Sequence, residues 1–270
     1  MSWRNSPQEI SSAAGPMAGP GRRVKCKVIL VLPAYNEGPN LDPLLSSMHD
    51  AMAAAGLPYE VVVVDDGSSD NTLDVLEECK RKYPLTVVVH ERNRGLAKTI
   101  RDGLLEAARR ATSADVIVTM DGDGTHPPSI IVKMLELIEG GCDVVVASRF
   151  RPGARVRGVP LHRQALSVGA SWLCRILFPT RGIRDFTCGY RAFRPGVLVE
   201  ASRVYGERLF DTEGFSCTMD LLLKLRRMKL VFAETPIDLR YDLKGGLSKM
   251  RVGSTIATSL ALMFRRRLGF

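Results

Sequence analysis

The chain has 270 residues, of which 45% are hydrophobic and 25% charged, as is usual for a globular protein with a buried core. Its net charge of +9 favours acidic partners such as nucleotides, phosphates or anionic lipids, whereas 6% aromatic residues and no recognition motif give no reason to predict nucleic-acid binding. With no signal-like start, no apolar run of about 18 residues and no C-x-x-C pair, we predict a cytoplasmic protein with reduced thiols and neither a transmembrane helix nor a zinc site.

Strand-like runs begin after an unusual first segment. Residues 1–25 are rich in Gly, Pro, Ser and Ala, which predicts a disordered leader. Five runs of mostly β-branched residues follow, and each is apolar almost throughout, as is typical of parallel strands covered on both faces. These runs occupy residues 27–33, 60–66, 85–90, 115–121 and 143–148.

Helical patterns alternate with these strands. We expect Gly56 to end the first helix as a C-cap, and Asp70 or Asn71 to begin the second as an N-cap. Strand–helix alternation predicts βαβ units, and therefore an α/β fold with an open, mostly parallel sheet flanked by helices. The predicted helices cover residues 40–56, 70–83, 95–111 and 127–141.

The regular alternation of strands and helices ends at about residue 150. Two helices, one strand and a final basic helix are expected, over residues 163–179, 215–229, 230–241 and 255–270. We predict a single domain over residues 26–252, followed by an amphipathic basic helix over residues 253–270.

Charged side chains follow the predicted strands. In open parallel sheets, ligands bind at the carboxyl ends of the strands. Three of the four loops there carry carboxylates, and the fourth carries Arg149 and Arg151. The loop "DGDGT" places Asp121 and Asp123 after the fourth strand. Paired carboxylates need a positive partner, and Mg²⁺ commonly takes one or two of them together with substrate phosphates, which indicates a cation that bridges a diphosphate.

The same loop permits other interpretations. D-x-D-G-T is also the nucleophile and acid–base pair of haloacid-dehalogenase-like phosphatases, where it ends the first strand rather than the fourth. A solvated turn is the third interpretation. His126 is either a neighbour of the metal or a polar turn residue, and Glu37 is either a ligand contact or a helix cap.

Seven segments occur in an order that resembles inverting glycosyltransferases of GT-A fold, most closely the polyprenyl-phosphate (dolichol-phosphate) mannose synthases. The match covers roughly residues 27–252, and the element at 185–192 points to the polyprenyl-phosphate group in particular. The segments are "VLPAYNEGPNL", "EVVVVDDGSSDNT", "RNRGLAKTIRDGL", "MDGDGTHPP", "SRFRPG", "DFTCGYRAFRPGVL" and "ETPIDLRYDLKGGLSKM".

The resemblance implies roles for individual residues. Two positions depart from the pattern. Thr125 stands where Gln or Ser is common, and Leu243 stands where an arginine is expected, so that Arg240 or Lys244 would take that role. Asp220 corresponds to an acidic position near the acceptor. The implied nucleotide-sugar-binding residues are Pro33, Tyr35, Glu37, Val64, Asp66, Asp121, Gly122, Asp123, Arg149 and Lys249, the metal ligands are Asp121, Asp123 and Thr125, and the catalytic residues are Asp121, Asp123, Arg149 and Asp220.

The implied reaction is a metal-dependent, inverting transfer of a sugar from a nucleotide-sugar donor to a polyprenyl phosphate, with Mg²⁺ or Mn²⁺ as cofactor. Mannose from GDP-mannose fits the resemblance most closely, while glucose from UDP-glucose and a soluble acceptor remain alternatives. The basic side chains expected around the two phosphorylated substrates are Arg149, Arg151, Arg155, Arg191, Lys244 and Lys249. For Arg191, the alternative role is that of a structural partner for Asp185.

Two predicted helices bear on where the protein acts. Those over residues 163–179 and 255–270 combine apolar faces with arginines, as helices at a membrane surface do. Core-facing helices show the same periodicity. We therefore expect either peripheral association with the cytoplasmic face of a membrane or packing of both helices against the core.

Overall fold

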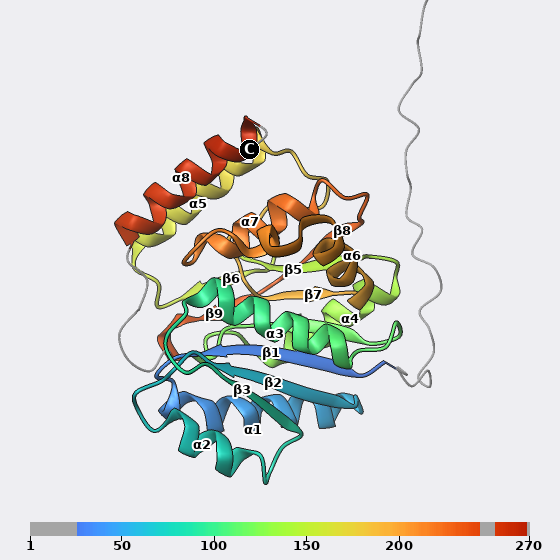
Figure 1. The fold of residues 1–270 in the computed structure, drawn as a ribbon. Coiled ribbons are helices and arrows are strands. Elements are labelled where there is room, and N and C mark those ends of the chain that lie inside the picture. The colour runs from blue at the N-terminus through green and yellow to red at the C-terminus, as the bar shows by residue number, and fades with distance from the viewer. Residues whose placement is uncertain (1–25, 244–251, 269–270) are drawn as a thin grey trace, which may run out of the picture.

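A seven-stranded sheet forms the centre of the molecule in this computed structural model, which describes residues 26–243 and 252–268 (Figure 1). The predicted leader, Lys244 and Lys249 lie outside the described residues. The strand order is β3-β2-β1-β4-β7-β5-β8, and only β7 runs antiparallel to its neighbours. The strands are β1 (Val28–Ala34), β2 (Tyr59–Asp65), β3 (Leu85–Val89), β4 (Val116–Thr119), β5 (Val144–Ser148), β7 (Arg191–Phe193) and β8 (Phe232–Pro236).

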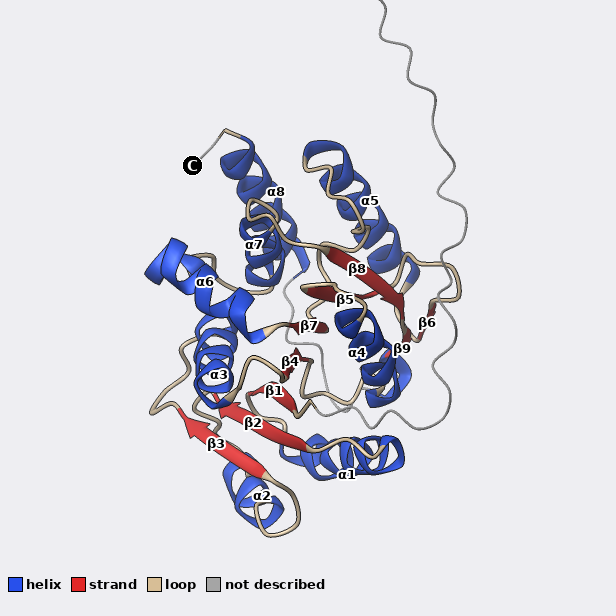
Figure 2. Ribbon diagram, turned by 90° about the vertical axis from the view of Figure 1, so that its right-hand side faces the viewer, coloured by secondary structure: helices blue, strands red, loops and turns tan. Residues whose placement is uncertain are grey.

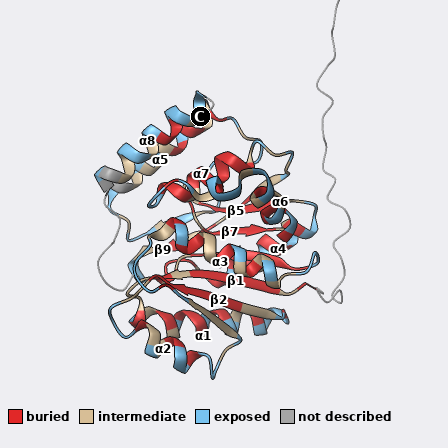
Figure 3. Ribbon diagram, viewed as in Figure 1, coloured by how far each residue is buried: buried red, intermediate tan, exposed pale blue. Residues whose placement is uncertain are grey.

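Helices cover both faces of this sheet (Figure 2). Leu30 of β1 packs in the cluster that includes α1 and α4, whereas Val31 packs in the cluster that includes α3 and α6. This two-sided burial explains the continuous apolar runs, and Figure 3 shows the strands of the sheet largely in the colour of buried residues. The helices are α1 (Gly38–Ala55), α2 (Thr72–Cys79), α3 (Leu96–Arg110), α4 (Ile131–Glu139), α5 (Leu161–Leu177), α6 (Pro195–Tyr205), α7 (Ser216–Leu225) and α8 (Val252–Arg267), with short 3-10 turns at η1 (Pro128–Ile130), η2 (Gly206–Phe210) and η3 (Tyr241–Leu243).

The predicted fold class is confirmed, and so are several helix boundaries. Gly56 adopts φ 64°, the left-handed conformation of a glycine C-cap. Asp70 accepts hydrogen bonds from the backbone N–H of Thr72 (3.0 Å) and from its hydroxyl (2.5 Å) at the start of α2. The motif at 185–192 leads into the unpredicted strand β7, which is too short for a periodicity signal.

The single strand predicted over 230–241 is wrong in one respect, because the structure has two strands there. β8 belongs to the large sheet, whereas β9 (Asp238–Arg240) pairs with β6 (Arg155–Arg157) in a small second sheet. Ile237 lies between them: its N–H donates to the carbonyl of Ser148 (3.2 Å) and its carbonyl accepts from Arg155 N–H (2.9 Å). The chain thus leaves one sheet for the other at this residue.

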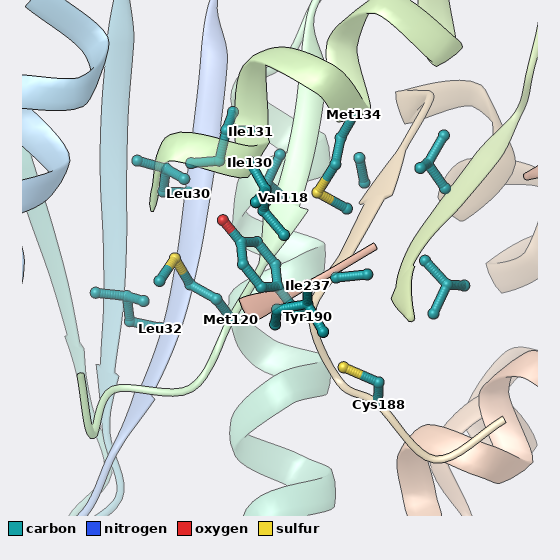
Figure 4. Close-up of a cluster of buried hydrophobic side chains, with 14 of the residues drawn as sticks. Leu30, Leu32, Val118, Met120, Ile130, Ile131, Met134, Cys188, Tyr190 and Ile237 are labelled. Atoms are coloured by element: carbon teal, nitrogen blue, oxygen red, sulfur yellow. The ribbon is translucent and has the colours of Figure 1, made fainter. Parts of the chain in front are cut away.

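A buried cluster fixes the base of the loop after β4 (Figure 4). Tyr190 is fully buried among Leu30, Val118 and Met134, and its hydroxyl donates to the carbonyl of Pro127 at 3.1 Å. In the described part of the chain, none of the helices has both the length and the apolar character needed to cross a bilayer.

Candidate active site

The site lies at the carboxyl edge of the sheet. The parallel strands β1, β2, β4 and β5 all end at this edge, so their loops meet there. Because β7 runs the other way between β4 and β5, it begins at the same edge, with Arg191 opposite Thr119 and Val146. The loop over residues 185–190 therefore joins the four loops that the sequence singled out.

The loop after β4 holds its two aspartates differently. Asp123 is nearly buried, at 9% exposed, and its Oδ1 accepts hydrogen bonds from the N–H (3.2 Å) and the hydroxyl (2.7 Å) of Thr125. The Asp121 side chain is 47% exposed. A Cβ on Gly122 would come within 2.8 Å of the carbonyl oxygen of Pro33, so the loop after β4 touches the last residues of β1 at a point that only glycine permits. The predicted residues Pro33, Gly122, Asp123 and Thr125 are thus brought together.

His126 orients this loop from beneath. Its Nδ1 accepts the backbone N–H of Asp121 at 3.1 Å, so the ring carries its proton on Nε2, which lies 3.9 Å from Asp121 Oδ2. The ring is buried and stacks on Tyr190, with 5.0 Å between centroids. These contacts favour the turn role for His126 over a place beside a metal.

The oxygen atoms of this loop fit a hard divalent cation. Asp121, Asp123 and Thr125 offer carboxylate and hydroxyl oxygens, the ligand type that Mg²⁺ and Mn²⁺ prefer. Among the described residues, no three His, Cys, Asp or Glu side chains gather into a metal cage. A cation bound at this loop would therefore share its coordination with water and substrate phosphates, as Mg²⁺ commonly does.

The loop after β2 is tightly built around Asp66. This carboxylate is 3% exposed and accepts hydrogen bonds from the N–H groups of Arg94 (2.8 Å) and Gly95 (2.9 Å), while His90 Nδ1 lies 2.7 Å away. Val64 is fully buried, and a Cβ on Gly103 of α3 would lie 3.0 Å from it. The side chain of Val64 therefore faces α3, and a nucleotide bound at this position would contact the backbone of Val64 rather than its side chain.

The loop after β1 bends at Asn36, which has φ 52°. Its N–H donates to Ser68 Oγ (2.8 Å), which ties it to the loop after β2. Tyr35 and Glu37 are partly buried on either side. Glu37 occupies the N-cap position of α1, yet its carboxylate accepts from Asn40 Nδ2 (2.6 Å) and makes no capping bond to a helix N–H. The capping interpretation of Glu37 therefore lacks its defining contact.

Arg149 is held by Asp185. Its Nε and Nη2 donate to the two carboxylate oxygens at 2.8 Å each, and its backbone N–H adds a third bond at 3.1 Å. Asp185 is fully buried, and the N–H groups of Thr187 and Cys188 also donate to it. Burial alone would raise the pKa of Asp185, but the charge and hydrogen bonds of Arg149 hold it below its ordinary value. Nη1 of Arg149 has no hydrogen-bond partner in the described part of the chain.

Two expectations for Arg191 are wrong. It does not pair with Asp185, because its guanidinium donates to the carbonyls of Thr218 (2.5 Å) and Phe186 (3.0 Å). It is also 1% exposed, so it is not available to surround a substrate, and burial lowers its pKa to about 10. Arg191 instead joins β7 to the start of α7 and to the loop at 185–190.

The other predicted basic residues lie at different depths. Arg151 is partly buried, with Nε 3.9 Å from Oε2 of Glu234, and Arg155 is exposed on β6. The N–H of Arg240 donates to the carbonyl of Thr125 (3.0 Å), while its side chain pairs with Asp242 (2.8 Å). β9 therefore lies against the loop after β4, but the Arg240 guanidinium is already engaged.

Asp220 lies in a cluster of cations between α7 and α8. It is 1% exposed, and its oxygens lie 2.7 Å from both Lys224 Nζ and Arg266 Nε and accept the Thr212 hydroxyl at 2.8 Å. Its implied role near the acceptor stays a prediction. The start of α7 does approach the site, since a Cβ on Gly189 would lie 3.5 Å from Thr218 and 3.7 Å from Asp121.

The open, mostly parallel sheet with an acidic loop at its carboxyl edge agrees with the predicted GT-A fold class. The sequence profile of glycosyl transferase family 2 matches residues 29–200, and the chain belongs to that family. A dolichol-phosphate mannosyltransferase of Pyrococcus furiosus is 36% identical over 242 residues, which are 88% of this chain and 63% of that protein. A polyprenol monophosphomannose synthase of Mycolicibacterium smegmatis is 33% identical over 238 residues, covering 87% and 84% of the two chains. The chain thus spans less than two thirds of the archaeal relative.

The fold is also similar to a solved structure. Glucosyl-3-phosphoglycerate synthase from Mycobacterium tuberculosis, in complex with Mn²⁺, UDP and glucosyl-3-phosphoglycerate, superimposes with a TM-score of 0.65 and 21% identity, covering 92% of this chain and 82% of that one. This likeness concerns the fold. The family assignment confirms the predicted resemblance to polyprenyl-phosphate mannose synthases and favours the transferase over the phosphatase interpretation of Asp121 and Asp123.

Two parts of the site escaped the sequence analysis. The Asp185–Arg149 pair joins residues 36 positions apart, although the spacing D-x-T is itself typical of a carboxylate that binds the backbone two residues on. His90 is buried between Asp66 and Asp102 (3.1 Å from Nε2), a contact that no local sequence pattern indicates.

Proposed function

We propose that this chain transfers a hexosyl group, mannose from GDP-mannose, to the phosphate of a polyprenyl phosphate in a reaction that depends on Mg²⁺ or Mn²⁺. The observation that carries the proposal is the contact of the loop after β4 with the end of β1, at Gly122 and Pro33, with Arg149 following β5 at the same sheet edge. The names of the two curated relatives support the choice of sugar and acceptor.

The chain's own groups act on charge and position. Asp121 and Asp123 would hold the cation, which when bound neutralises charge on the departing diphosphate. Arg149 is fixed by Asp185 with Nη1 available for a phosphate oxygen. A phosphate monoester acceptor is largely dianionic near neutral pH, since its second pKa is about 6, and it needs little help from a general base. The transfer therefore depends on positioning and electrostatics rather than on proton removal.

Exposed apolar side chains on α5 and α8 support contact with a membrane. Val168, Trp172 and Ile176 recur every fourth residue along α5 and are 52%, 63% and 56% exposed. Leu260 and Phe264 do the same on α8, at 49% and 67%. Residues four apart share one helix face, and the two helices lie side by side (Figures 1 and 2). We propose that these stripes rest on the membrane that contains the lipid acceptor.

Product analysis tests the reaction. The full chain is incubated with polyprenyl phosphate and either GDP-mannose or UDP-glucose, with Mg²⁺, with Mn²⁺ or with a chelator, and the lipid product is identified by mass spectrometry. We expect mannosyl product from GDP-mannose that disappears with the chelator and in Asp123→Asn. Asp74→Asn removes an equivalent charge from an exposed position on α2 and should retain full turnover. Glucosyl product alone would replace the proposed donor, and no product with either donor would contradict the proposal.

Trp172 reports the membrane contact separately. The sequence contains two tryptophans, Trp3 and Trp172, so a Trp3→Phe variant leaves one probe. We expect a blue shift of its emission with phosphatidylcholine–phosphatidylglycerol vesicles, and less vesicle binding after Trp172→Ser. An unchanged spectrum with no co-sedimentation would refute the membrane contact while leaving the reaction untouched.

A further inference from the structure

A basic cavity lies away from the site described above. Its volume is about 180 Å³, whereas a single water needs only about 10–15 Å³ by the same kind of measure. It opens where α5, α7 and α8 end, and five of its eight lining side chains are cationic. The lining residues are Phe178, Tyr205, Leu223, Lys224, Arg226, Arg227, Arg266 and Arg267.

Two of the five cations are neutralised within the protein. Lys224 Nζ lies 2.6 Å from Asp211 and 2.7 Å from Asp220. Arg266 lies 2.7 Å from Asp220 and 3.1 Å from Asp211. These two cations and two carboxylates balance each other in charge, and Arg265, which does not line the cavity, lies 3.9 Å from the same Asp211.

The other three cations are not neutralised. Arg226, Arg227 and Arg267 have no carboxylate within ion-pair distance among residues 26–243 and 252–268. Arg226 stacks on Phe178, 5.2 Å from the ring centroid, and its pKa is lowered by burial and by the charges of Arg227 and Arg267. The C-termini of α5, α7 and α8 each offset about half a charge, which leaves about 1.5 positive charges facing the cavity.

We propose that this cavity binds a phosphate monoester group, carried by a lipid headgroup or free in solution. Such a group has a charge of about −1.5 to −2 near pH 7, which matches the uncompensated charge. Arginine forks suit phosphate oxygens. Arg226 lies eight residues beyond Thr218 along α7, or about 12 Å at 1.5 Å per residue, so the cavity is separate from the loops at the sheet edge. Asp220, predicted to lie near the acceptor, contacts its lining residues Lys224 and Arg266.

The surroundings admit both sources of the phosphate. Ile176, 56% exposed, precedes the lining residue Phe178 by two positions at the end of α5, and Phe264, 67% exposed, lies about one turn before Arg267 on α8. A lipid phosphate would reach the cavity from the apolar stripes of these two helices. A soluble phosphate would enter it directly.

Two probes and a charge-matched pair of variants test the proposal. Inorganic phosphate binding is measured by calorimetry, and lipid binding by co-sedimentation with phosphatidylcholine vesicles with and without phosphatidic acid. The cavity variant is Arg226→Gln, Arg227→Gln and Arg267→Gln. The control variant is Arg81→Gln, Arg109→Gln and Lys133→Gln, which removes the same charge from exposed positions on other helices or beside them.

We expect the cavity variant to bind phosphate or phosphatidic-acid vesicles about tenfold more weakly or worse, and the control variant to behave as the unmodified chain. Weakening with vesicles alone would assign the site to lipid, and weakening with inorganic phosphate would assign it to a free phosphate group. Equal binding of both probes by the two variants would overturn the proposal. If the triple variant does not fold, Arg227→Gln with Arg267→Gln, both exposed, answers the same question.

Discussion

Replacing Asp185 by asparagine tests how the arginine of the site is held. The carboxylate is fully buried, and it receives both arms of the Arg149 guanidinium and three backbone N–H groups. Removing one partner of a buried pair typically costs about 3–5 kcal/mol. Because the Arg149 side chain is 20% exposed and asparagine keeps one acceptor oxygen, we expect a loss of about 2–4 kcal/mol in the free energy of unfolding. Urea denaturation followed by circular dichroism measures it.

An exposed pair of the same geometry provides the control. Arg157 donates to both carboxylate oxygens of Asp238, at 3.1 Å and 2.9 Å, but the two side chains are 45% and 39% exposed. Asp238→Asn should therefore cost only about 0–1 kcal/mol. Similar losses for the two substitutions would refute the reasoning, because both pairs are bidentate but only Asp185 is buried and bound by three backbone N–H groups.

Three further results are expected. Gly122→Ala should reduce transfer at least about tenfold, since the new Cβ would meet the Pro33 carbonyl, whereas Gly196→Ala, with open space around it, should not. Below about pH 4, urea denaturation should show a steeper loss of stability for the unmodified chain than for Asp185→Asn. The pKa of Asp185 is lower in the folded than in the unfolded chain, so its ionised carboxylate stabilises the fold above the unfolded-state pKa, and this contribution is lost as the pH falls towards the folded-state pKa. Arg266→Gln should lower the unfolding free energy by about 1–3 kcal/mol, and an unchanged urea midpoint would contradict the network it forms with Asp220.

Most strands of the sheet could be predicted because each has a clear pattern in the sequence. Both faces of β1, β2, β4 and β5 are buried, so each strand is a continuous apolar run, and Gly56 marks the end of the first helix. β7 was not predictable, because it has three residues and lies antiparallel between two strands that are distant in sequence. The division of residues 230–241 into β8 and β9 depends on pairing with β6, which is a tertiary choice.

The site divides in the same way. Asp121 and Asp123 stand directly after a strand, so their place at the sheet edge follows from the fold. Pairing with Asp185 was one of two alternatives predicted for Arg191, whereas the structure pairs Asp185 with Arg149, which follows the strand β5 beside β7. A sequence pattern suggests partners that are near in the chain, whereas the pairing of β7 with β5 brings together residues that are 36 positions apart.

Binding of Mn²⁺ tests the central claim most directly, because the loop after β4 offers too few protein ligands to hold the ion alone. Free Mn²⁺ is measured by electron paramagnetic resonance with and without GDP, for the unmodified chain, Asp123→Asn and Asp74→Asn. We predict tight binding of Mn²⁺ only when GDP is present, lost in Asp123→Asn and retained in Asp74→Asn. Equal binding by Asp123→Asn and the unmodified chain would contradict the account.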